Sequence, residues 1–145
     1  IMALGVTPEQ LKLSLPADIT TVYGVIMDWE MGGAIATIIA YETGDASLYL
    51  SSGGGIIGGG QHEFVNKAAK KLITIAQTHL DKALKTEDID LPASNHVRFY
   101  FLTNKGKFIG EDDMKNFENN TSYWQTLFEQ ANNILTELRM TTEKP

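Results

Sequence analysis

Three stretches near the start of the chain have the hydrophobic pattern of β-strands. Residues 21–28 and 35–41 are rich in β-branched and aromatic side chains, which favour extended structure. In residues 46–52 apolar and polar side chains alternate, as in a strand with one buried face and one face toward water. Because the turn-forming pairs Gly32-Gly33 and Gly44-Asp45 separate these stretches, the pattern predicts a three-stranded antiparallel meander.

Two longer segments have the 3.6-residue periodicity of amphipathic helices. In residues 62–84 the apolar side chains recur on one helical face, while lysine, threonine, asparagine and glutamine occupy the other. Residues 122–138 show the same pattern, and Ser122 and Gln125 have the spacing of a capping box at its start. We therefore predict two long helices, each with one buried face.

One shorter helix and one hairpin complete the pattern. The short helix is predicted to start at Thr7, because threonine followed by proline is typical of a helix start, and to end before Pro16. Residues 97–102 alternate like a strand, and the turn Asn104-Lys105-Gly106 leads to a short return strand over residues 107–109. The predicted order is helix, three strands, helix, two strands, helix.

This order predicts one α+β domain over residues 1–145, in which an antiparallel sheet of about five strands is covered by two long amphipathic helices. A chain of 145 residues with 43% hydrophobic side chains is long enough to bury a single core. We expect that core to contain side chains from both helices and from the strand over residues 97–102: Leu72, Ala76, Phe99, Phe101, Leu127 and Leu135.

Composition excludes several classes of function. The chain has no cysteine, so it cannot form disulfides or the thiolate sites of redox and zinc proteins. Its formal net charge is −6, its lysines gather in residues 61–85, and it has only two arginines, which argues against nucleic-acid binding. Because no apolar run reaches the roughly 18 residues of a membrane span and no signal peptide is visible, we expect a cytoplasmic protein that does not enter a membrane.

A glycine-rich loop separates the third predicted strand from the first long helix. Residues 53–60 contain six glycines around Ile56-Ile57, and each ordered glycine costs roughly 0.5 to 1 kcal/mol relative to alanine. The loop is therefore either a mobile connector whose isoleucines pack into the core, or a segment whose backbone contacts a partner chain or an anion. We expect alanine at Gly54 and Gly59 to leave the fold intact, because neither lies inside a predicted helix or strand.

The loop matches one phosphate-binding pattern by spacing. Gly53, Gly55 and Gly58 fit G-x-G-x-x-G, but dinucleotide binding needs a parallel βαβ unit, and the flanking strands are predicted to be antiparallel. No Lys-Ser or Lys-Thr pair follows the glycines, so the loop is not a P-loop. We therefore predict no nucleotide cofactor.

The spacing of reactive side chains indicates no assembled catalytic site. His62 beside Glu63 has the composition of a general base oriented by a carboxylate, although a surface histidine near a helix start is the commoner arrangement. Two groups of carboxylates, Asp28 with Glu30 and residues 111–113, match no metal-binding loop. We predict no catalytic residue, no metal site and no cofactor, and favour a protein that is not an enzyme.

Two resemblances accompany these patterns. Residues 43–59, which read TGDASLYLSSGGGIIGG, resemble part of an uncharacterised family of short bacterial proteins, which implies a bacterial source but no activity. The order of strands and helices resembles the profilin-like and roadblock-like domains, which implies a role as a scaffold or a partner-binding module.

We therefore expect a non-catalytic protein that associates with itself, as a homodimer or larger homo-oligomer, or binds a protein partner. The alternative is a small-ligand or anion-binding domain, enzymatic or not, that uses the same glycine-rich loop. For either function the predicted contact residues are those of the loop and its flanks: Ser51, Ser52, Gly53, Gly54, Gly55, Ile56, Ile57, Gly58, Gly59, Gly60 and His62.

Overall fold

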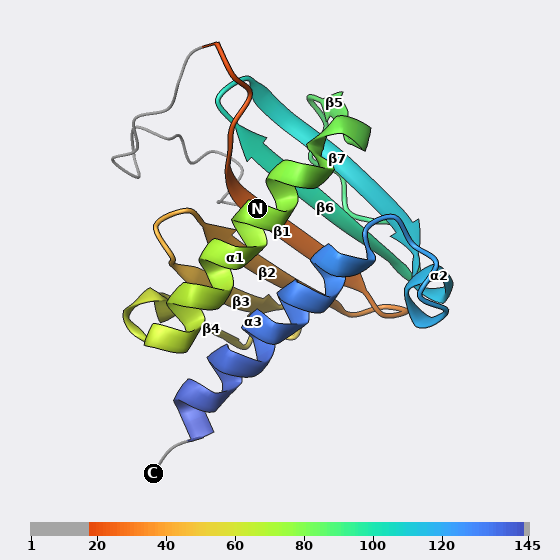
Figure 1. Cartoon of the computed structure of the whole chain (residues 1–145). Helices are drawn as coiled ribbons and strands as arrows, with labels where there is room; N and C mark the ends of the chain where they lie inside the picture. The colour runs from red at the N-terminus through yellow and green to blue at the C-terminus, as the bar shows by residue number, and fades with distance from the viewer. Residues whose placement is uncertain (1–17, 144–145) are drawn as a thin grey trace.

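A computed structural model describes residues 18–143 and shows two layers, a sheet and a pair of helices. Helices α1 (Glu63–His79) and α3 (Gln125–Glu143) lie side by side and antiparallel across one face of the sheet (Figure 1). The α+β class, the antiparallel sheet and the two covering helices are therefore confirmed. The short helix predicted from Thr7 lies outside the described residues.

The sheet has seven strands, two more than predicted, and every neighbouring pair is antiparallel, in the order β4-β3-β2-β1-β6-β7-β5. The predicted meander is present as β1, β2 and β3, which pair in sequence order. The two additional strands, β4 and β5, are short and lie at opposite edges of the sheet. The strands are β1 (Val22–Glu30), β2 (Ile35–Tyr41), β3 (Ala46–Leu50), β4 (Gly55–Ile56), β5 (Leu84–Thr86), β6 (His96–Thr103) and β7 (Gly106–Asp113).

The helix boundaries differ from the predicted ones for local reasons. The first long helix ends at His79 and not near residue 84, because the chain passes through the 3-10 helix η3 (Leu80–Lys82) and then pairs with β7 as strand β5. The last helix begins at Gln125 and not at Ser122, whose Oγ accepts a hydrogen bond from the Trp124 backbone N–H. Two further short elements are the 3-10 helix η2 (Gly59–Gln61) and helix α2 (Met114–Glu118).

The main core lies between the sheet and the two helices. Leu72, Ala76, Phe99, Phe101 and Leu127 are buried there, as predicted. The prediction that Leu135 is buried is wrong, because this side chain is only half-buried. Helix α3 directs Ile134 and Leu138 into the core instead.

The opposite face of the sheet carries a second, smaller apolar cluster. It consists of Tyr23, Ile26, Ile39, Tyr100 and Leu102. The Tyr100 hydroxyl donates a hydrogen bond to the Asp90 carbonyl, so the segment 87–95 between β5 and β6 lies over this face. Tyr23 and Tyr100 therefore pack on the sheet face that carries neither long helix.

Candidate functional site

The glycine-rich loop is packed against the rest of the chain. Gly55 pairs with Tyr49 in β4, and a side chain at Gly55 would lie 2.4 Å from the Leu48 carbonyl oxygen. A methyl group at Gly59 would lie 2.4 Å from Leu138 Cδ2 in the core. Backbone approach within the chain itself therefore accounts for these glycines, without any partner or ligand.

Hydrogen bonds also attach the second half of the loop to its surroundings. The Gly60 N–H donates to Asp45 Oδ1 at 2.9 Å, and Asn66 of α1 donates from its side-chain amide to the Gly60 carbonyl at 3.1 Å. The Gly58 N–H donates to Ser47 Oγ at 3.3 Å. The loop thus runs back beside β3 and brings the start of α1 to the start of that strand.

The structure separates the two groups of polar side chains that flank the loop. Ser51 lies beyond the end of β3, where its Oγ accepts a hydrogen bond from the Ile35 N–H at 2.9 Å, and Ser52 is exposed in the turn that follows. His62 follows Gly60, which is bonded to Asp45 at the start of β3, so the length of this five-residue strand, about 17 Å, separates the two ends of the loop. Ser51, Ser52 and His62 therefore do not converge on one ligand.

The isoleucine pair of the loop is split between core and solvent. Ile56 pairs with Leu48 in β4 and packs, half-buried, against the main core. Ile57 is 73% exposed. Of the two isoleucines expected in the core, Ile56 therefore packs against it and Ile57 does not.

The packing of the loop changes the expected result of the two alanine substitutions. Gly59→Ala should lower the free energy of unfolding by about 1 kcal/mol, near the lower end of the range for overpacked sites. The added methyl group would collide with Leu138 Cδ2, which can move away only partly. Gly54→Ala, whose added methyl meets Leu50 Cδ1 at 3.7 Å, should be neutral or slightly stabilising. Urea unfolding curves of both variants test this, and equal midpoints would contradict the described packing at Gly59.

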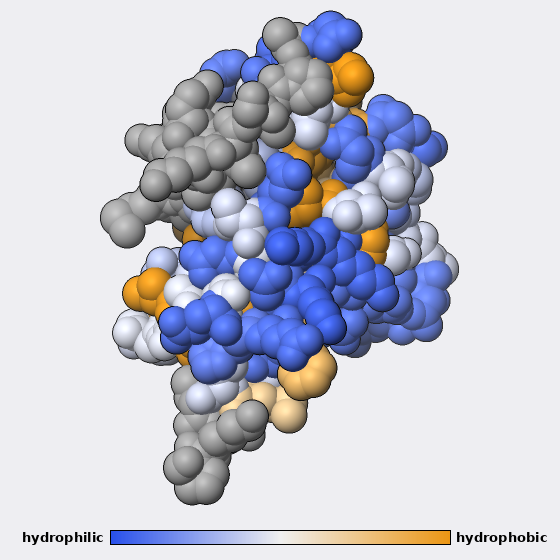
Figure 2. Space-filling view, turned by 60° about the vertical axis from the view of Figure 1, so that its left-hand side comes forward, coloured by the Kyte–Doolittle hydropathy of each residue, from blue (hydrophilic) through white to orange (hydrophobic). Residues whose placement is uncertain are grey.

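Two large apolar side chains are exposed where the start of α1 and the end of α3 meet, and both line one hollow. They are Phe64 and Met140, with 69% and 49% of their surfaces exposed. We call these two residues the apolar corner. Figure 2 shows hydrophobic residues exposed below a hydrophilic band at the same end of the molecule.

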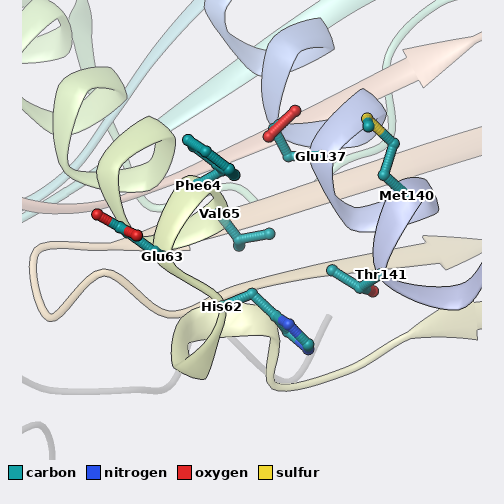
Figure 3. Close-up of a pocket in the computed structure, with 7 residues that line it drawn as sticks. All are labelled: His62, Glu63, Phe64, Val65, Glu137, Met140 and Thr141. Carbon is teal, nitrogen blue, oxygen red and sulfur yellow. The ribbon is translucent and has the colours of Figure 1, made fainter. Parts of the chain in front are cut away.

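A hollow of about 420 Å³ opens between the two helices at the apolar corner (Figure 3). Val65 contributes to the wall on the α1 side, Phe64 and Glu137 stand on opposite sides, and His62 extends toward Thr141 (Figure 3). The hollow therefore has apolar walls with few polar groups.

A second hollow of about 320 Å³ lies on the other side of α3, against β3 and β4. Its apolar walls come from Leu48, Leu50, Ile56 and Leu135, and Leu50 is 39% exposed. This hollow explains why Leu135 is only half-buried. On each side of the C-terminal part of α3, apolar side chains thus border a hollow that the chain itself leaves open.

The charged groups near the apolar corner have both signs. Glu63 and Lys67 form an exposed ion pair within α1, with 3.0 Å between Oε1 and Nζ. Glu137 borders the hollow, and neither Glu137 nor Lys71 forms an ion pair with any residue of the described range. An incoming chain would therefore find charged groups of both signs without an ion-pair partner.

The carboxylates singled out in the sequence have separate structural partners. Asp28 and Glu111 lie in one register row of the sheet, but Arg98 stands between them and donates its Nε hydrogen bond to Glu111. The Glu30 carboxylate accepts hydrogen bonds from three backbone N–H groups, which lowers its pKa. Asp113 accepts one from Lys115 N at the start of α2. Within residues 18–143 no group of three potential metal ligands occurs.

Comparison of the chain with protein-family models, curated proteins and solved structures found no match in any of the three. Across the part of the chain that the structure describes, no helix combines the length and apolar character needed to cross a membrane.

Proposed function

We propose that the protein is a non-catalytic docking module that binds a polypeptide surface at the apolar corner. The observation that carries this proposal is that Phe64 of α1 and Met140 of α3, far apart in the sequence, are both exposed and line the same apolar hollow. Single exposed apolar side chains are common on soluble proteins, whereas contiguous groups of them mark interaction surfaces.

The folded chain itself makes little use of these side chains. Phe64 points away from the apolar face of α1, whose buried residues are Val65, Ala69, Leu72, Ile73 and Ala76. With 69% of its surface in water, Phe64 contributes little of the roughly 1.5 to 3 kcal/mol that full burial of such a side chain provides. That free energy is gained when a partner covers it.

The geometry supports a polypeptide over a small ligand. Sites for small molecules combine an apolar cavity with a few polar groups that converge on the ligand. Here Ser51 and Ser52 lie beyond the far end of β3 from His62, and the exposure of Phe64 and Met140 leaves the hollow open to solvent. An open apolar surface with a hollow suits the surface of another folded polypeptide better than it suits a small molecule.

Site-specific photo-crosslinking in the native host tests the proposal. A benzophenone amino acid at position 64 or 140 should give a discrete covalent adduct with another polypeptide, because both side chains line the hollow. The same probe at position 91 should give none, because Leu91 is similarly exposed, at 57%, but lies in the segment after β5. If the two corner positions give no more adduct than position 91, the docking function is refuted.

A further inference from the structure

We infer that the polypeptide docked at the apolar corner is a second copy of this chain, related by a two-fold axis, with Phe64 of each copy in the hollow of the other. This inference rests on the proposed docking function and names its partner. It follows from two properties of the corner, its shape and its charge.

The shape is self-complementary. A two-fold contact uses the same patch on both subunits, so the patch must contain both a projecting group and a place to receive it. Phe64 projects from the first turn of α1 with 69% of its surface exposed, and the 420 Å³ hollow opens beside it. One rotation can therefore seat both phenylalanines at once.

The charges are self-complementary as well. Lys71 follows Phe64 by seven residues, so it lies two turns further along the same outward side of α1. Glu137 borders the hollow that receives the phenylalanine. Neither residue has an ion-pair partner within the described range. In the inferred dimer, each Lys71 faces the other copy's Glu137. Opposite charges at both ends of a two-fold contact fix its register.

A stable interface must be larger than the apolar corner itself. Specific interfaces bury about 800 Å² on each partner, about a tenth of the 7721 Å² that the chain exposes. Two side chains cannot supply this area. In the proposed dimer the contact continues along the outward side of α1, where Lys67 and Lys71 lie, and this places the charged pair inside it.

Sedimentation equilibrium of the purified chain is the first test. We expect a concentration-dependent dimer, and Phe64→Ala should raise its dissociation constant roughly tenfold or more, as loss of an aromatic anchor does. Leu91→Ala is the matched control and should leave the constant unchanged, and circular dichroism should show both variants folded. A wild-type chain that stays monomeric at every concentration refutes the inference, as does a dimer that ignores Phe64→Ala.

A charge exchange is the second test, and it separates a two-fold contact from other dimers. Lys71→Glu alone and Glu137→Lys alone should each weaken self-association, because each places like charges opposite one another. A mixture of the two variants should form a heterodimer in preference to either homodimer, because both pairs are then opposite in sign. Lys70→Glu is the control, since Lys70 borders a different hollow. No preference for the mixed dimer would refute the proposed register.

The two levels of proposal fail in different ways. If the chain is monomeric but positions 64 and 140 crosslink to a heavier, unrelated polypeptide in the host, the docking function stands and the second copy is refuted. If neither position forms an adduct and the chain is monomeric, both are refuted. A crosslinked product of twice the mass of the chain supports both.

Discussion

Replacing Leu127 with alanine is expected to lower the free energy of unfolding by about 2 to 5 kcal/mol, the usual cost of removing a buried leucine side chain. Leu127 is completely buried in the main core beneath α3. The surrounding side chains come from two layers of the fold and cannot all move to fill the space, so a cavity remains. Urea unfolding monitored by fluorescence or circular dichroism measures the change.

Leu135→Ala is the matched control, because it makes the same change two turns further along the same helix. Leu135 is half-buried at the edge of an open hollow, so water can reach the place that its side chain leaves. We expect a loss of about 1 kcal/mol, in the middle of the range for ordinary substitutions. Equal losses at positions 127 and 135 would show that the buried face of α3 is wrongly assigned.

The elements with the strongest periodicity were predictable from the sequence. The stripe of apolar residues in 62–84 and the alternation in 46–52 each reflect one face that must be buried, so they locate α1 and β3 directly. The edge strands β4 and β5 were not predictable. Each has only two or three residues, and each exists because a neighbouring strand offers it hydrogen bonds. Such pairing depends on the fold and leaves no local pattern.

The candidate site was predictable only in part. The glycine-rich loop drew attention to Ile57 and His62, and of these His62 lines the hollow at the apolar corner, whereas Ile57 does not. Phe64 was missed although it carried a signal, since a large apolar side chain on the lysine-rich side of an amphipathic helix has no place in the core. Met140 lay beyond the predicted end of the last helix. Its position depends on the antiparallel packing of α3 on α1, which no local pattern encodes.

Asp28→Asn is expected to raise the free energy of unfolding at neutral pH, because asparagine places no ionised group in this buried site. Asp28 is completely buried on β1, and Thr37 donates a hydrogen bond to its Oδ1 at 2.6 Å. Its Oδ2 has no hydrogen-bond partner in the described range. Arg98 lies opposite Asp28 on β6, but it donates its hydrogen bonds to Glu111, the Asp90 carbonyl and the Tyr100 hydroxyl.

Burial raises the pKa of the Asp28 carboxyl above its ordinary value, and the Thr37 hydrogen bond and the positive charge of Arg98 oppose this only in part. The folded state therefore binds a proton more tightly than the unfolded state does. Stability from this group is fully present below the unfolded pKa of about 3.9 and is lost as pH rises through the raised folded pKa. Asparagine stays neutral throughout and keeps an acceptor for Thr37.

The difference in stability between Asp28→Asn and the wild type should therefore grow from acid to neutral pH. Glu30→Gln on the same strand should show the opposite trend, because three backbone hydrogen bonds lower the pKa of the Glu30 carboxyl. That group stabilises the fold above its unfolded pKa and ceases to do so as pH falls through its lowered folded pKa. Urea unfolding of both variants at a series of pH values measures the two trends. A neutral-pH loss of stability in Asp28→Asn, or a pH-independent difference, would mean that the buried carboxylate has a partner when ionised.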